Sequence, residues 1–168
     1  MDFLVEWFEK VFGWLPDELF VALVSMVPLI ELRGGLPVAY ALGMSLWLAI
    51  PICIIANLIP VPFILWFITP IFNAMKKTKL FRPLVEKLEA RAMGKSDKIE
   101  KGYFWGLALF VGIPLPGTGA WTGALIASLL DIPFKKAFPA ILLGVLIATV
   151  IVGLLVWGLL DPVIALFV

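Results

Sequence analysis

Charge is almost absent from a long central part of this chain. From Leu19 to Met75 the only charged residues are Glu31 and Arg33. In the whole sequence 62% of the residues are hydrophobic and 15% are charged, whereas a soluble domain carries roughly 25% charged residues. The apolar runs are continuous rather than alternating, which favours helices as the spanning elements. The sequence therefore predicts an all-α, polytopic integral membrane protein, with residues 1–168 forming a single membrane domain.

Several kinds of chemistry are disfavoured by the residues that the chain lacks. It has no histidine and one cysteine, Cys53. The commonest general base and metal ligand is thus missing, and a lone thiol cannot form an intramolecular disulfide. The sequence also contains no carboxylate cluster, no Walker pattern and no GxGxxG pattern. We therefore expect no enzymatic activity, no metal site, no cofactor and no nucleic-acid partner.

Residues 1–15 have an amphipathic pattern. Aromatic and aliphatic side chains recur at helical spacing, and Asp2, Glu6, Glu9 and Lys10 fall on the other side. This predicts an interfacial helix at headgroup depth. Packing against a neighbouring protomer is the alternative, and a homodimer is one arrangement that the sequence leaves open. The acidic start also predicts that the chain has no cleavable signal peptide.

The first repeat is expected over residues 16–75, and it begins with a short apolar arm. Pro16 can start a helix, and Leu19–Ile30 would give about 18 Å of it, too short for a ~30 Å hydrocarbon core. The stretch PLIELRGGLP follows, with prolines and paired glycines that break helices. We therefore predict a turn there and a second arm over Leu36–Leu42, which together form a re-entrant hairpin. One tilted spanning helix over Leu19–Leu42 is the alternative.

A longer apolar run completes this repeat. Met44–Met75 is longer than a membrane requires, and four prolines must bend or interrupt it. We expect one kinked spanning helix with irregular ends. Asn57 is its one strongly polar interior residue.

The polar connector at residues 76–101 predicts the orientation of the chain. It has nine cations against four anions, a net charge of +5, and residues 1–18 have one cation against five anions, a net charge of −4. Basic connectors between membrane segments favour the cytoplasmic side. We therefore predict a multi-pass protein of the plasma membrane, with the connector cytoplasmic and the N-terminal helix outside.

The second repeat, residues 102–160, follows the same order. Tyr103–Ile113 and Ala120–Leu130 are short apolar arms on either side of a turn that begins the stretch PLPGTGAWTG. A polar loop follows, and Ala137–Leu160 is long enough to span with tilt. We expect Asp161 and Pro162 to end that helix.

The two halves share their order of elements rather than their residues. Shifted by 86 positions, Pro28 falls on Pro114, Leu29 on Leu115 and Ala41 on Ala127. The first hairpin should start and end outside and the second inside, so the repeats would have inverted topology. Secondary transporters use this arrangement, with the substrate at the midplane between broken helices.

Glu31 and Arg33 are the main candidates for chemistry. A charge at the membrane centre costs about 2.5–3.5 kcal/mol on insertion scales, so each needs a partner, water or a function. In one interpretation, Arg33 binds an anionic head group, while Glu31 either holds Arg33 in place or takes up a proton. In the other, Glu31 and Arg33 form an ion pair that only fixes the loop. The alternative for the second turn is packing through its small residues, and the alternative for Asn57 is packing through one interhelical hydrogen bond. The candidate substrate-binding residues are Glu31, Arg33, Gly34, Gly35, Pro37, Asn57, Pro114, Pro116, Gly117, Thr118, Gly119 and Thr122.

The stretches PLIELRGGLP and PLPGTGAWTG resemble the two signature regions of the small multidrug export protein family. That family is similar to a branch of the DedA (VTT) superfamily, and the resemblance covers about residues 20–155. It implies facing re-entrant hairpins, movement of anionic lipids such as polyprenyl phosphates or phospholipids between leaflets, and dependence on the proton gradient. Membrane lipids and protons are the partners it implies. Many DedA proteins have arginines in the second hairpin, and this chain has none. Export of hydrophobic cations through Glu31, and a scaffold that transports nothing, are the alternatives.

Overall fold

The computed structural model describes residues 15–76, 83, 99–115 and 117–167, and all regular elements in these ranges are helices. The predicted N-terminal helix and most of the basic connector lie outside the described residues. The helices are α2 (Asp17–Met26), α3 (Glu31–Ala41), α4 (Leu46–Leu58), α5 (Pro60–Lys76), α7 (Ile99–Gly112), α8 (Ala120–Leu129) and α9 (Phe134–Phe167).

The helices follow one order twice: short helix, turn, short helix, long helix. We name α2 and α3 the first helix pair, and α7 and α8 the second. After the first pair, α4 and α5 meet at Ile59, whose backbone stays helical. Among the described residues, two stretches are long and apolar enough to cross a membrane, Leu46–Ile71 and Phe134–Gly158. The structure thus has a long apolar helical stretch where the sequence predicted a spanning helix, and it consists of two helices, α4 and α5, that meet at Ile59.

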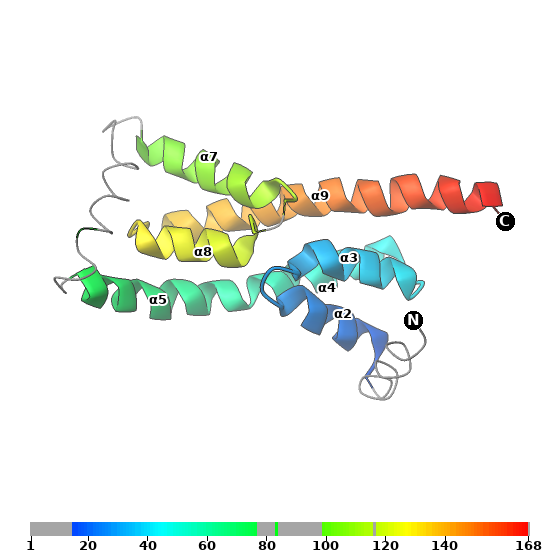
Figure 1. Ribbon diagram of the computed structural model, residues 1–168, viewed down its shortest axis with the longest axis horizontal. Coiled ribbons are helices and arrows are strands. Elements are labelled where there is room, and N and C mark those ends of the chain that lie inside the picture. The colour runs from blue at the N-terminus through cyan, green and yellow to red at the C-terminus, as the bar shows by residue number, and fades with distance from the viewer. Residues whose placement is uncertain (1–14, 77–82, 84–98, 116, 168) are drawn as a thin grey trace.

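The two helix pairs point in opposite directions along the molecule. Figure 1 shows α2 and α3 extending to one end and α7 and α8 to the other, with their turns together in the middle. The long helices α5 and α9 run beside them, and α9 begins at the end of the molecule where α5 finishes. This arrangement brings the two turns together although they are far apart in the sequence.

The first turn differs from its prediction. Helix α2 ends at Met26, the turn covers residues 27–30, and Glu31 already begins α3. Pro28 lies in the turn and Leu29 has a left-handed backbone with φ 73°, so the chain reverses before the charged residues. The prediction that Glu31 to Pro37 form the turn was therefore wrong, and so was the alternative of one helix over 19–42.

The paired glycines and Pro37 lie inside α3 instead of breaking it. Proline removes only one backbone hydrogen bond there, and the neighbouring turns hold the helix. Gly35 fits where a side chain could not, because an added Cβ would overlap the Ser25 hydroxyl and lie 3.2 Å from the Cys53 sulfur. Small residues allow such close helix contacts within a membrane.

The second helix pair agrees closely with its prediction. Helix α7 ends at Gly112, the turn covers residues 113–119, and α8 begins at Ala120. The end of α9 does not agree, since the helix continues through Asp161 and Pro162 to Phe167. As at Pro37, a proline costs a helix one hydrogen bond without ending it.

Candidate functional site

Glu31 caps a helix that belongs to the other half of the chain. Its side chain is buried, with 2% of the residue exposed. The carboxylate accepts hydrogen bonds from the backbone N–H of Ala120 and of Trp121, each at 3.1 Å. These amides open α8, where backbone donors have no partner within the helix and the helix dipole is positive. Glu31 thus supplies the acceptor that α8 lacks.

Arg33 performs the opposite role at the end of α7. Its Nη2 atom lies 3.1 Å from the Val111 carbonyl oxygen, 3.0 Å from that of Ile113 and 3.0 Å from that of Thr118. The Thr118 hydroxyl lies 3.3 Å from the same nitrogen. Because Nη2 carries two hydrogens, these acceptors share its bonds. A cation at the C-terminal end of a helix is stabilised by the negative end of the dipole.

The two charges also bind each other. Arg33 Nη1 donates to Glu31 Oε2 at 3.2 Å. The pair therefore spans the break between α7 and α8, with each charge at the helix end of opposite sign. We name Glu31, Arg33, Thr118 and the backbone groups that bind them the central polar cluster. Its internal bonds offset the cost of burying two charges.

The second turn makes a reciprocal contact with the first pair. The Trp121 indole N–H donates to the Met26 carbonyl oxygen at 3.0 Å. Met26 is the last residue of α2, where carbonyls lack partners. Trp121 thus closes the end of α2 through this hydrogen bond. The first residues of α3 and of α8 thus close helix ends in the opposite half.

Two backbone features fit the central polar cluster closely. Glu31 has a left-handed backbone, with φ 54°, a conformation that costs a non-glycine residue about 1–3 kcal/mol and persists where its surroundings fix it. Gly119 lies against the Glu31 carboxylate, and an added Cβ would overlap that carboxylate. The position before α8 therefore has room for Glu31 only while residue 119 is glycine.

The structure brings together part of the predicted residue set. Glu31, Arg33, Thr118 and Gly119 meet directly in or beside the central polar cluster. The remaining predicted residues occupy other places. Pro114 and Gly117 share the second turn, Thr122 lies in the first turn of α8, Gly34, Gly35 and Pro37 lie within α3, Asn57 lies in α4, and Pro116 is outside the described residues.

Asn57 lies at the level of the central polar cluster. Gly35 of α3 is beside Cys53 of α4, and the short loop between these helices makes them antiparallel. One turn back along α3 reaches Glu31, and one turn forward along α4 reaches Asn57. Asn57 is fully buried, and neither its side-chain oxygen nor its nitrogen has a protein partner, so the interhelical hydrogen bond predicted for it was wrong. Arg33 Nε also lacks a partner. Buried polar groups without partners are costly and indicate a place for water or a ligand.

The sequence reasoning missed the helix ends. It treated Glu31 and Arg33 as groups for a substrate or for each other, and did not match them to backbone groups of the second turn. A signal was present, because α8 begins after Gly119 and has no side-chain cap of its own. A helix start without a cap, together with an isolated carboxylate in an apolar stretch, points to such a pairing.

Comparison with known proteins gives one family. Residues 31–151 match the sequence model of the family described as "Putative small multi-drug export protein" (Sm_multidrug_ex). No curated protein and no solved structure matches the chain. The wider likeness to the DedA superfamily stays a prediction. The family match covers most of the chain, from α3 with the central polar cluster through the second helix pair into α9, so the protein belongs to the small multi-drug export protein family.

Proposed function

We propose that this protein moves amphiphiles with an anionic head group across the membrane, and that the central polar cluster is where the head group crosses. The family description and the two long apolar helices indicate a membrane export protein. The proposal that the head group is anionic rests on one observation. Two backbone amides at the start of α8 and the Arg33 guanidinium surround the Glu31 carboxylate, so the protein's own anion fills an anion-binding site.

A substrate head group could use the same donors. Helix N-termini bind phosphate and carboxylate through free backbone amides and the positive end of the dipole. The planar guanidinium of Arg33 suits the oxygens of a phosphate or carboxylate. If Glu31 leaves, these groups are free to hold a head group near the middle of the molecule. Glu31 then acts as an internal competitor that closes the site between transport events.

Protonation of Glu31 offers a way to open the site. A proton removes the charge of the carboxylate, which weakens its bonds to Arg33 and to the α8 amides. The left-handed backbone at Glu31 adds a tendency to relax once those bonds are lost. Coupling to a proton gradient follows from this step, because release of Glu31 would depend on proton uptake.

The proposed setting is a membrane with the two helix pairs as re-entrant hairpins of inverted repeats. The opposite directions of the pairs in Figure 1 support this. The net charges of −4 at residues 1–18 and +5 at residues 76–101 support a cytoplasmic connector. Cysteine probes at Asp17 and Ser45, in a Cys53→Ser background, should then label from the same side. Labelling from opposite sides would overturn the hairpin.

Export of hydrophobic cations is the second candidate, and a groove between α2 and α4 favours it. Its volume is about 510 Å³, its lining is almost wholly apolar, and Glu18 is its one charged lining residue. A carboxylate beside an apolar groove complements a lipophilic cation. The family description agrees with this candidate.

Transport in proteoliposomes tests both candidates. Flipping of a labelled anionic phospholipid is measured with and without a proton gradient, beside uptake of tetraphenylphosphonium. We expect a gradient to stimulate lipid flipping by the natural sequence, Glu31→Gln to flip without this response, and Arg33→Lys to lose most flipping while folding normally. Thr69→Val is the control, because its hydroxyl bonds only within α5. Cation uptake without lipid flipping would favour the second candidate, and neither activity would favour the scaffold.

A further inference from the structure

A groove opens between α7 and α8 at the end of the second helix pair that lies away from the central polar cluster. Two adjoining cavities of about 180 and 210 Å³ form it, and they share Tyr103, Leu107, Leu130 and Ile132 as lining residues. A cavity needs roughly 10–15 Å³ to hold one water molecule, so these two cavities have room for a much larger ligand. We name these joined cavities the α7–α8 groove.

Glycines of α7 keep the 210 Å³ cavity of the groove open. Gly102 and Gly106 line it, and a Cβ added at either would meet no atom within 4 Å. They are four residues apart, so they share one face of α7. By contrast, a Cβ at Gly123 or Gly144 would collide with Val111, and one at Gly112, further along α7, would lie 3.0 Å from Ile147. Gly102 and Gly106 thus leave space that the described chain does not fill.

The length and chemistry of the groove suit a hydrocarbon chain. From Gly102 to Phe110, both of which line it, α7 rises about 12 Å. That is close to half of a ~30 Å hydrocarbon core, the share of one leaflet. The lining of the 210 Å³ cavity is almost entirely apolar. A chain that lies along α7 would therefore extend from one membrane surface toward the midplane.

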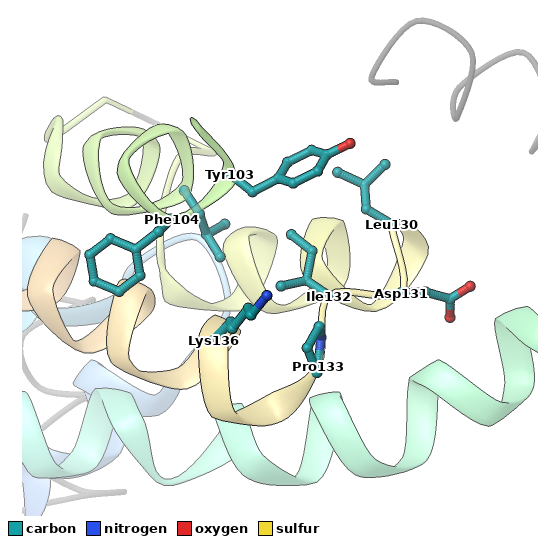
Figure 2. A pocket seen from close by; sticks show the side chains of 8 residues that line it. Tyr103, Phe104, Leu130, Asp131, Ile132, Pro133 and Lys136 are labelled. Carbon is teal, nitrogen blue, oxygen red and sulfur yellow. The ribbon is translucent and has the colours of Figure 1, made fainter. Parts of the chain in front are cut away.

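The mouth of the groove is polar and carries a cation. Tyr103 and Lys136 line it together with Asp131. In Figure 2 the Lys136 side chain extends into the space between Phe104 and Ile132, whereas the Asp131 carboxylate points away. Tyrosine is enriched at headgroup depth, and lysines near a membrane surface attract anionic lipids.

We propose that the α7–α8 groove binds one acyl chain of an anionic phospholipid from the leaflet on the side of the basic connector, with Lys136 beside its head group. The inference rests on the proposed function for its membrane setting, and it names where the lipid substrate leaves that leaflet. An acyl chain in this position would extend along α7 toward the central polar cluster, which lies where α7 ends and α8 begins.

Photo-crosslinking tests the site directly. The purified protein in nanodiscs is labelled with phosphatidylglycerol that carries a diazirine on one acyl chain, and mass spectrometry locates the adducts. Phosphatidylcholine with the same chain is the comparison. Gly106→Leu fills the open space without a clash, and leucine also favours helix over glycine, so this variant should fold. Gly158→Leu is the matched control, because that glycine of α9 also faces open space and does not line the groove.

We expect adducts on the lining residues of α7 and α8, at least fivefold fewer of them in Gly106→Leu, and no change in Gly158→Leu. Lys136→Gln should remove the preference for phosphatidylglycerol over phosphatidylcholine. Equal labelling of the natural sequence and Gly106→Leu would overturn the groove as the site, and equal labelling by both lipids in the natural sequence would overturn the anionic head group. Because labelling needs no transport, adducts without lipid flipping would reject the proposed function alone, and flipping without adducts would reject only this site.

Discussion

The two turns that meet in the middle of the molecule share one backbone feature and differ in chemistry. At the shift of 86 residues, Pro28 corresponds to Pro114 and Glu31 to Gly117, and both Glu31 and Gly117 have left-handed backbones, with φ 54° and 81°. Glycine adopts this conformation without strain, whereas glutamate does not. Glu31, the first residue of α3, thus combines a left-handed backbone with a charge, and its hydrogen bonds to Ala120 and Trp121 in the other half offset the strain.

The second turn supplies what the first lacks. Its described residues have no ionisable side chain, but it presents the open end of α7 and the uncapped start of α8. Arg33 corresponds by the same shift to Gly119, the residue that makes room for the Glu31 carboxylate. One half thus provides charges and the other provides helix ends and space.

Removal of the Arg33 charge should have the largest effect on stability, because it breaks the contact between the two halves. Arg33→Gln leaves the Glu31 carboxylate buried without its charged partner, and breaking such a pair destabilises a protein by about 3–5 kcal/mol. We expect a large fall in the thermal unfolding temperature in detergent. Arg33→Gln combined with Glu31→Gln should recover part of the loss, because no unpaired charge then remains. A double variant less stable than the single one would show that the charges act independently.

A side chain at the partner glycine should have a smaller effect. In Gly119→Ala the added methyl overlaps the Glu31 carboxylate, and overpacking of this kind costs about 1–3 kcal/mol. The carboxylate should move away from the α8 amides. The measurement is thermal unfolding together with the response of lipid flipping to a proton gradient, which we expect to weaken. Gly158→Ala is the control, since its added methyl faces open space. Equal stability of both variants would contradict the close approach at Gly119.

Much of the fold could be predicted from the sequence, since apolar run lengths determine which helices are short and which are long. The second turn was placed correctly because the segment from Gly112 to Gly119 concentrates helix-breaking prolines and glycines, and the chain does leave the helix there. The first was misplaced because Gly34 and Gly35 were interpreted as flexible points. Gly35 instead fits α3 against Ser25 and Cys53, a tertiary reason that composition does not reveal.

The candidate site was predicted in part for a related reason. Isolated charges identified Glu31 and Arg33, since burial without partners is costly. Their actual partners are backbone groups of Val111, Ile113 and Ala120, among others, and any residue type presents such groups. Side-chain identity therefore gives no direct signal for them. Only the expectation that every helix end needs a partner could have led from one turn to the other.

Asn57 offers the finest test of the difference between the halves. Its counterpart in the second half, at the same shift, is Leu143 of α9. Asn57→Leu therefore makes the halves alike at this position. Because the amide has no protein partner, an apolar residue of similar size should leave stability unchanged or raise it by about 1–2 kcal/mol.

The two readings of Asn57 differ in transport rather than in stability. If Asn57 only fills space, lipid flipping in Asn57→Leu should equal that of the natural sequence. If its amide binds a water or head group beside the central polar cluster, flipping should fall about tenfold, which corresponds to about 1.4 kcal/mol in the barrier. We expect the fall, since a fully buried amide without a partner is retained at a cost that packing does not require. Leu143→Ala, which opens space in the other half without changing polarity, separates this loss from a general effect of altered packing.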